Sequence, residues 1–476
     1  MKKIALLALQ FAIAFTAWGI TPQEAVNRFA LDNTMRHASL GVMIMGIDSG
    51  NVIASYNPDL SVITASTMKT VTSTTALELL GGDYRFETVV HTIGEIDGNK
   101  LKGNLIITGY GDPTLGSQYF PKNNIIGEII DSLRNAGITE IQGRIIVDAS
   151  FYNYPAYSGW WDIGDIAEDY GAGVHGLNYR DNLVTVKFNV DPQGNINNLT
   201  LSPQVPGVEI TNMMHSGSRN NWSASLDYGH SAVVLYGETN PGNHSYTIAN
   251  PRPDLMLKAE VEAALKQAGI KVENRELTFE SGEGDHAVLL SHYSPVSTDI
   301  ITSLLDRSDN MFTHALLRAV GSRQGSYKRG EMGIDYAGAD AVKQMLRDRG
   351  IDDSALFMLD GSGLARANKN SVRTFCEMLR YMAERKYGTD SLRLCDLMPS
   401  AGRRIGSVLG NNALCDSIKL KSGSMSDVQC FVGYYPADKP QVVWAILANN
   451  YSCERSTLKD NMSRMLIDAL PASKQN

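Results

Sequence analysis

The chain has 476 residues, which is long for a single hydrophobic core, so we expect two or three domains. Its composition, 43% hydrophobic and 20% charged, is typical of a globular protein. Acidic residues outnumber basic ones by 51 to 43, and no basic block occurs, which argues against nucleic acid as a partner.

The longest apolar run lies at the start of the chain, in residues 1–19. Lys2 and Lys3 precede the apolar stretch Ile4–Ala17, and small residues follow it. This order is typical of a cleaved signal peptide; a buried N-terminal helix is the alternative. No second segment is apolar enough to span a bilayer. We therefore expect an exported, periplasmic protein without a transmembrane anchor, a Gram-positive exterior being the alternative location.

The first predicted elements are a hairpin over Leu40–Tyr56, with its turn at Asp48–Asn51, and a helix over Ser66–Leu80. Residues 89–290 differ, because short strands alternate there with loops rich in Asn, Gly and Pro. Leu183–Val190 alternates apolar and polar residues, as a half-buried strand does. We expect this region to be a β-rich insertion made of two nested small domains, with helices near residues 125–136 and 255–268.

Helical patterns return after Pro295, where Ser297 or Thr298 can cap a helix and a second helix follows Asn310. Two more helices are expected near residues 337–349 and 371–385. The end of the chain predicts three strands and a helix, over residues 417–421, 428–435, 442–449 and 458–470. The predicted fold class is α/β (α+β): a catalytic domain of residues 20–88 and 291–476, with an antiparallel sheet flanked by helices, carries the insertion.

Cysteine and histidine patterns indicate no metal site and no cofactor. The nine histidines lack ligand spacing, and the cysteines form no CxxC pair. The cysteine count is odd, and the sequence leaves open whether these residues form disulfides or remain thiols. The five cysteines are Cys376, Cys395, Cys415, Cys430 and Cys453.

Three short motifs carry the chemistry. In Ser66-Thr67-Met68-Lys69 a serine at a helix start has a lysine one turn later on the same face. A serine hydroxyl needs a neighbouring base, and lysine can serve when burial and nearby positive charge lower its pKa toward 7–8. Ser308-Asp309-Asn310 offers a hydroxyl and an amide on a loop between two predicted helices.

The third motif, Lys421-Ser422-Gly423, lies at the end of a predicted strand. Its lysine can attract a substrate carboxylate and lower the pKa of Lys69, and its glycine lets a peptide approach the strand edge. Each motif alone is more often a solvated helix start, a helix cap or an edge strand. In this order and context, SxxK, SDN and K[ST]G are the signature of the serine penicillin-recognising enzymes.

With these motifs, the chain resembles the D-Ala-D-Ala carboxypeptidase/endopeptidase family, the low-molecular-mass class C penicillin-binding proteins. The resemblance covers nearly the whole chain after residue 19. It includes Gly109–Leu115, Tyr170–Ala172 with Asn178 and Asp181-Asn182, and Asp360–Arg366. The separation of 242 positions from Ser66 to Ser308 also matches, since this family carries an inserted domain between the first two motifs.

The resemblance implies a role for each motif residue. Ser66 would be the acylated nucleophile, Lys69 its base, and Ser308 the proton relay to the leaving D-alanine. Asn310 would hold the substrate amide. The terminal carboxylate would bind at Lys421 with Ser422, and the backbone N–H groups of Ser66 and Ser424 would form the oxyanion hole. Arg366 would contact the peptide stem. Peptidoglycan stem peptides would be the substrates, and β-lactam antibiotics the inhibitors.

The sequence departs from the family pattern at a few positions. Ser422 replaces the commoner threonine but keeps the hydroxyl, and Thr313-His314 differs from the usual residues. Two alternative functions stay open: a β-lactamase or esterase that uses the same site, and a non-catalytic cell-wall binding protein. The long insertion argues against the first, and the three intact motifs argue against the second.

Overall fold

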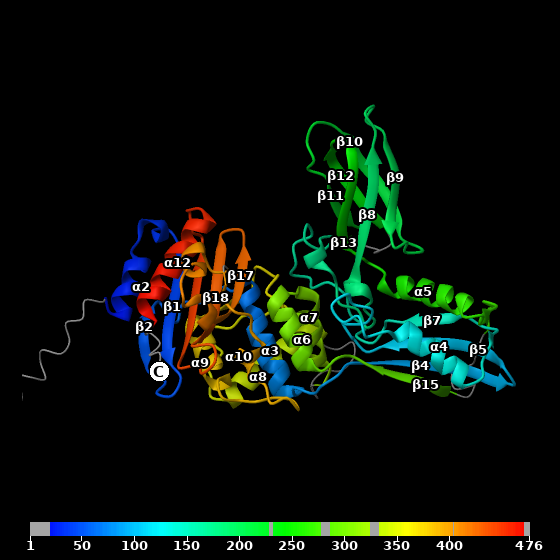
Figure 1. Cartoon of the computed structure of the whole chain (residues 1–476), viewed down its shortest axis with the longest axis horizontal. Helices are drawn as coiled ribbons and strands as arrows, with labels where there is room; N and C mark the ends of the chain where they lie inside the picture. The colour runs from blue at the N-terminus through cyan, green and yellow to red at the C-terminus, as the bar shows by residue number, and fades with distance from the viewer. Residues whose placement is uncertain (1–19, 228–231, 278–285, 324–332, 403, 471–476) are drawn as a thin grey trace, which may run out of the picture. The chain divides into compact units, whose positions relative to one another are not determined.

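The computed structural model describes residues 20–227, 232–277, 286–323, 333–402 and 404–470 (Figure 1). The predicted signal peptide, residues 1–19, lies outside the described residues. The described chain divides into two compact units. The first comprises the residues up to Val62, Asn370–Ala383 and those from Ser400 on; the second comprises Ile63–Lys369 and Glu384–Pro399.

The first unit is built on a five-stranded sheet in the order β17-β18-β19-β1-β2, in which every neighbouring pair is antiparallel (Figure 1). Its strands are β1 (Ser39–Gly46), β2 (Val52–Tyr56), β17 (Lys419–Met425), β18 (Val428–Tyr435) and β19 (Val442–Asn449). The β1–β2 pair confirms the predicted hairpin, and β18 and β19 have the predicted bounds. β19 lies beside β1, so strands from both ends of the chain share this sheet.

Helices cover both faces of this sheet. They are α2 (Pro22–Ala30), α9 (Val372–Met382), α11 (Ser407–Gly410) and α12 (Arg455–Ala469). Leu40, Val42 and Ile44 of β1 belong to the hydrophobic core that α2, α11 and α12 share. Gly41 lies between them on the other face, where a Cβ atom would touch Val372 of α9. Because both faces are covered, every residue of β18 and β19 is buried.

One part of the second unit is mainly helical and contains α3 (Met68–Leu79), α6 (Ser297–Arg307), α7 (Asn310–Ser322), α8 (Ile334–Asp348) and the short α10 (Leu394–Leu397). The predicted side-chain cap of α6 is wrong. Val296 occupies the cap position, and Ser297 is already helical. The hydroxyl of Ser297 instead donates to the carbonyl groups of Gly81 and Gly82, which joins α6 to the turn after α3.

The other part of the second unit is rich in strands, as predicted. A six-stranded sheet contains β4 (Glu87–Asp97), β5 (Lys100–Gly109), β6 (Glu140–Ile141), β7 (Ile145–Asp148), β14 (Lys271–Val272) and β15 (His286–Tyr293). The helices α4 (Ile125–Asn135) and α5 (Pro253–Gln267) also lie in this region, close to the predicted bounds.

Two three-stranded sheets complete this region. One has the order β13-β8-β9, with β8 (Leu183–Val190), β9 (Ile196–Ser202) and β13 (Gly242–Ala249). The other has the order β10-β12-β11, with β10 (Glu209–Ser216), β11 (Ser223–Leu226) and β12 (Ala232–Thr239). β8 has the predicted bounds and buries every second residue, Val184, Val186, Phe188 and Val190.

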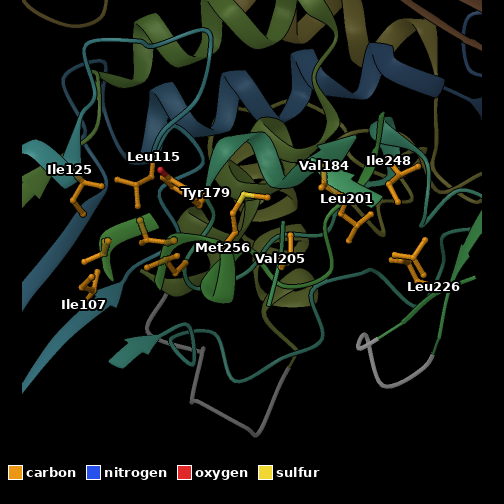
Figure 2. Close-up of a cluster of buried hydrophobic side chains, with 14 of the residues drawn as sticks. Ile107, Leu115, Ile125, Tyr179, Val184, Leu201, Val205, Leu226, Ile248 and Met256 are labelled. Atoms are coloured by element: carbon orange, nitrogen blue, oxygen red, sulfur yellow. The ribbon is translucent and has the colours of Figure 1, made fainter. Parts of the chain in front are cut away.

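One hydrophobic cluster connects all of these strands and helices (Figure 2). Ile107 of β5, Ile125 of α4 and Met256 of α5 belong to it together with Val184 of β8 and Leu226 of β11. An antiparallel sheet flanked by helices in one unit and a strand-rich region in the other form the α+β class predicted from the sequence. The extents of the insertion, residues 89–290, and of the catalytic domain stay predictions.

Candidate active site

The side chains of Ser66 and Lys69 lie together at the start of α3. A 3₁₀ turn over Ala65–Thr67 leads into this helix, so Ser66 precedes the first helical residue and Lys69 follows one turn later. The Nζ atom of Lys69 lies 2.9 Å from Oγ of Ser66. Lys69 is completely buried, whereas Ser66 is only partly so. A base with its nitrogen in hydrogen-bond distance of a hydroxyl is the arrangement that nucleophilic catalysis needs.

Two further acceptors surround the same nitrogen. Lys69 Nζ donates to Oδ1 of Asn310 at 2.6 Å and to the backbone carbonyl of Ser362 at 2.7 Å. The structure thus brings the first two predicted motifs together, although Lys69 and Asn310 lie 241 positions apart in the sequence. The carbonyl of Ser362 is a contact that the motifs did not predict.

The loop that carries the second motif is set by the helices on either side. Ser308 ends α6 with φ 62°, in the left-handed region. Asp309 caps α7, and its Oδ1 accepts from the N–H of Phe312 at 2.9 Å. Asn310 is the first residue of α7, and its Nδ2 donates to the carbonyl of Tyr170 at 2.8 Å. Both ends of the Asn310 amide are therefore bound, which fixes its oxygen toward Lys69.

A buried turn over residues 360–365 presents the Ser362 carbonyl. Asp360 Oδ1 accepts from the backbone N–H groups of Ser362 and Gly363, both at 2.7 Å. Its Oδ2 accepts from the N–H of Ala365 at 2.6 Å and from Nε1 of Trp161 at 2.8 Å. Sequence reasoning noted this segment as part of the family resemblance but gave only Arg366 a role. Arg366 is exposed at the end of the turn.

Burial is the main influence on the protonation of Lys69. It lowers the pKa of Lys69 from its ordinary 10.5 to about 7, while the carboxyl groups of Asp360 and Asp309 act in the opposite direction. Burial also raises the pKa of Asp309, against its hydrogen bond from Phe312 and the charge of Arg307. The predicted contribution of Lys421 to the pKa of Lys69 stays a prediction.

A cavity of about 170 Å³ adjoins the Ser308–Asn310 loop. The guanidinium group of Arg307 lies over the ring of Tyr119 in its wall, and Arg307 Nη2 donates to Oδ2 of Asp309 at 3.0 Å. Asp181 and Tyr170 also line this cavity. The cavity therefore offers space for a ligand next to the Ser308–Asn310 loop.

The third motif belongs to the first unit, in β17, the end strand of the five-stranded sheet. The predicted strand ended at Lys421, but β17 continues to Met425, so Lys421-Ser422-Gly423 lies inside the strand. In the pairing with β18, Lys421 lies opposite Val432 and Ser424 opposite Gln429. Lys421 is buried, and its Nζ donates to the carbonyl of Ser422 at 2.7 Å. The predicted convergence of this motif with Ser66 stays a prediction.

The described residues also bear on the predictions about metal sites, disulfides and membrane-spanning helices. No group of three or more histidine, cysteine, aspartate or glutamate side chains in the described ranges is arranged to hold a metal ion. All five cysteines fall within those ranges, and none forms a disulfide. None of the helices that the structure describes is both long and apolar enough to cross a membrane.

The chain resembles known proteins both in sequence and in fold. The model of the D-Ala-D-Ala carboxypeptidase 3 (S13) family matches residues 22–469. The chain belongs to this family. Its sequence is 24% identical to the D-alanyl-D-alanine carboxypeptidase DacB of Haemophilus influenzae, over 87% of this chain and 86% of that protein.

The crystal structure of penicillin-binding protein 4 (dacB) from H. influenzae has a similar fold, with a TM-score of 0.77 and 23% identity over 94% of this chain and 99% of that one. A second structure of that protein, in complex with a β-lactam, matches with a TM-score of 0.72 and 22% identity over the same shares. The predicted enzyme class, a serine-type D-Ala-D-Ala carboxypeptidase, is therefore confirmed at the level of the family.

Proposed function

We propose that this S13-family enzyme hydrolyses peptidoglycan stem peptides at D-Ala-D-Ala termini and at D-alanyl cross-links, through an acyl-enzyme on Ser66. The observation that carries this proposal is the contact of 2.9 Å between Lys69 Nζ and Ser66 Oγ inside a site that buries the lysine. A pKa of about 7 leaves much of Lys69 neutral near neutral pH, so that it can accept a proton.

In the first step, Ser66 Oγ forms a bond to the carbonyl carbon of the penultimate D-alanine while its proton moves to Lys69. The negative oxygen that develops lies between the backbone N–H groups of Ser66 and Ser424, a type of stabilisation worth about 3–4 kcal/mol. The C–N bond then breaks, and the leaving amine receives the proton from Lys69 through the hydroxyl of Ser308. The products are the acyl-enzyme and free D-alanine, or a released strand when the bond was a cross-link.

Hydrolysis of the acyl-enzyme reverses the proton transfer. A water molecule forms a bond to the acyl carbon, its proton passes to Lys69, and the bond to Ser66 Oγ breaks as that oxygen regains a proton. Water is the only co-reactant, and the enzyme returns to its starting state. Since one base serves both steps, a variant without it loses acylation and deacylation together.

Substrate binding is assigned to the third motif and to its neighbours. Lys421 and Ser422 bind the terminal carboxylate of the peptide, Asn310 binds its amide, and Arg366 contacts the stem. The position of Ser424 in the end strand of its sheet supports a peptide that lies along β17. β-Lactams enter the same site and acylate Ser66; the β-lactam complex of the H. influenzae protein supports this part. The periplasm is the proposed location, on the basis of the predicted signal peptide.

A Ser66→Ala variant tests the proposal. Purified muropeptides are incubated with the wild-type enzyme and the variant, and mass spectrometry follows the loss of one D-alanine and the cleavage of dimers. We expect both products from the wild type and neither from the variant. Ser73→Ala is the matched control, because Ser73 is a buried serine of the same helix whose hydroxyl makes no hydrogen bond to any described residue. An S66A enzyme as active as S73A would refute the mechanism.

The alternative β-lactamase function is tested with the same proteins. Acylation of Ser66 by penicillin should give an adduct that persists for many minutes, because the site is proposed to release a peptide acyl group and not a drug. Rapid turnover of penicillin would favour the β-lactamase alternative instead.

A further inference from the structure

A fully buried histidine holds the turn that contacts Lys69. The backbone N–H of Gly361 donates to Nδ1 of His314 at 3.3 Å. The carbonyl of the same glycine accepts from Oγ1 of Thr72 in α3 at 2.7 Å. Gly361 lies next to Ser362, whose carbonyl accepts from Lys69. The hydrogen bonds of the Gly361 N–H and carbonyl groups therefore help to fix the position of the Ser362 carbonyl, which accepts from Lys69.

His314 lies on α7, one turn after Asn310, so both side chains lie along the same side of the helix. Its Nε2 lies 3.1 Å from Oδ1 of Asp335 in α8. Arg318 donates to both oxygens of Asp335, from Nε at 2.7 Å and from Nη2 at 3.2 Å. The ring of Trp161, which donates to Asp360, packs 5.4 Å from the ring of His314.

These contacts select one form of the histidine. Because Nδ1 accepts from Gly361, it carries no proton, and the ring proton of the neutral form belongs on Nε2, facing Asp335. Burial acts to raise the pKa of Asp335, but the neighbouring His314 and Arg318 outweigh it and hold that pKa well below its ordinary value. Asp335 therefore stays ionised, and its carboxylate lies beside Nε2 of His314.

The orientation of the Lys69 amine depends on its acceptors. A neutral amine has two hydrogens and one lone pair. When Asn310 Oδ1 and the Ser362 carbonyl take the two hydrogens, the lone pair is left for the hydroxyl of Ser66. If the Ser362 carbonyl moves away, the amine can rotate and present a hydrogen to Ser66, which blocks proton acceptance.

We propose that His314 is a positioning residue: it anchors Gly361, thereby fixes the Ser362 carbonyl, and so aims the lone pair of Lys69 at Ser66. This inference rests on the proposed function.

The test compares His314→Leu, which lacks the acceptor, with His314→Gln, whose amide can accept from Gly361 and donate to Asp335. The rate of Ser66 acylation by a fluorescent penicillin is measured from pH 5.5 to 9.5. We expect H314L to acylate at least tenfold more slowly at pH 8, and H314Q to recover at least half of the wild-type rate. The pH midpoint of the acylation rate should fall in H314L, because the protonated form of Lys69 is no longer stabilised by the Ser362 carbonyl. The carboxyl groups of Asp309 and Asp360 remain beside Lys69.

His292→Leu is the matched control. His292 is also a buried histidine paired with a carboxylate, Glu128 at 2.8 Å, but it lies on β15. We expect H292L to keep the wild-type rate and midpoint even where its melting temperature falls. An H314L rate within twofold of wild type, or equal losses in H314L and H314Q, would overturn the positioning role. A wild-type enzyme that forms no adduct on Ser66 would overturn the proposed function as well.

A second variant covers the case in which H314L does not fold. Thr72→Val keeps the shape of the side chain and removes the hydroxyl that donates to Gly361. It should slow acylation at least threefold and lower the pH midpoint. A T72V enzyme with the wild-type rate and midpoint, in the absence of folded H314L, counts against the inference.

Discussion

The backbone of Gly363 lies directly against the carbonyl oxygen of Ala65, so closely that a Cβ atom on residue 363 would overlap this oxygen. Gly363 also has φ +84°, a conformation that residues with a side chain rarely adopt. Ala65 is itself in the left-handed region with φ 44°, immediately before Ser66. The turn that contacts Lys69 therefore also supports a strained peptide beside the nucleophile.

Gly363→Ala should both destabilise the protein and slow acylation. A positive φ alone costs an alanine roughly 1–2 kcal/mol. The overlap with Ala65 adds to this, and any movement that relieves it shifts Ser66. Gly81→Ala is the matched control, because Gly81 has φ +92° with open space around its Cβ position. Urea unfolding and penicillin acylation should show a larger loss of both quantities in G363A; equal effects in the two variants would contradict this account.

The acylation rate should depend on the protonation of Lys69. Only the neutral amine accepts the proton of Ser66, and burial places the pKa of Lys69 at about 7. We therefore expect the rate to rise with pH through about 7 and to level off above it. Stopped-flow measurements with a β-lactam check this profile. A rate that is flat from pH 5.5 to 9 would show that Lys69 is not the base.

Asn310→Asp should move that profile to higher pH. The substitution places a carboxylate in contact with Lys69 Nζ, where the amide oxygen now lies at 2.6 Å. An opposite charge at this distance favours the protonated lysine and raises its pKa by roughly 1–3. Asn310→Ala removes the acceptor without adding charge and serves as the control, with a loss of about 10–100-fold in rate. A midpoint unchanged in N310D would mean that this contact does not form in solution.

Asp335→Asn should destabilise the fold strongly near neutral pH. It leaves Arg318, which is fully buried, without its anionic partner, and breaking a buried pair in this way costs about 3–5 kcal/mol. Asp348→Asn, on the surface of the same helix, should change stability by less than about 0.5 kcal/mol.

The pH dependence of this effect has a definite sign. The folded-state pKa of Asp335 lies below its ordinary 3.8, so its stabilisation is fully present above about pH 4 and is lost as the pH falls through the folded-state pKa. The difference in unfolding free energy between wild type and D335N should therefore shrink on acidification below pH 4. Denaturant titrations at pH 7 and pH 3 measure it, and a difference that grows at pH 3 would contradict the assignment.

Local patterns predicted most of the helices and the strands of the five-stranded sheet, because such patterns depend on nearby residues. The alternation in β8 and the glycines after α3 act within one strand or one turn, and both elements lie where expected. The cap of α6 was wrong for a tertiary reason: the Ser297 hydroxyl meets two carbonyl groups more than 200 residues earlier in the chain. The end of β17 was missed since its pairing with β18 extends the strand past the motif.

By itself the sequence determined the chemical groups, their order along the chain and the family. The reason is that SxxK, SDN and K[ST]G are short local motifs that together identify this group of enzymes. Only the tertiary structure decided which groups surround Lys69. A carbonyl has no signature in a sequence, so the contact with Ser362 was invisible there, as was the path from Asp335 through His314 to Gly361. Burial, which lowers the pKa of Lys69, is likewise a property of the packed chain and of no single residue.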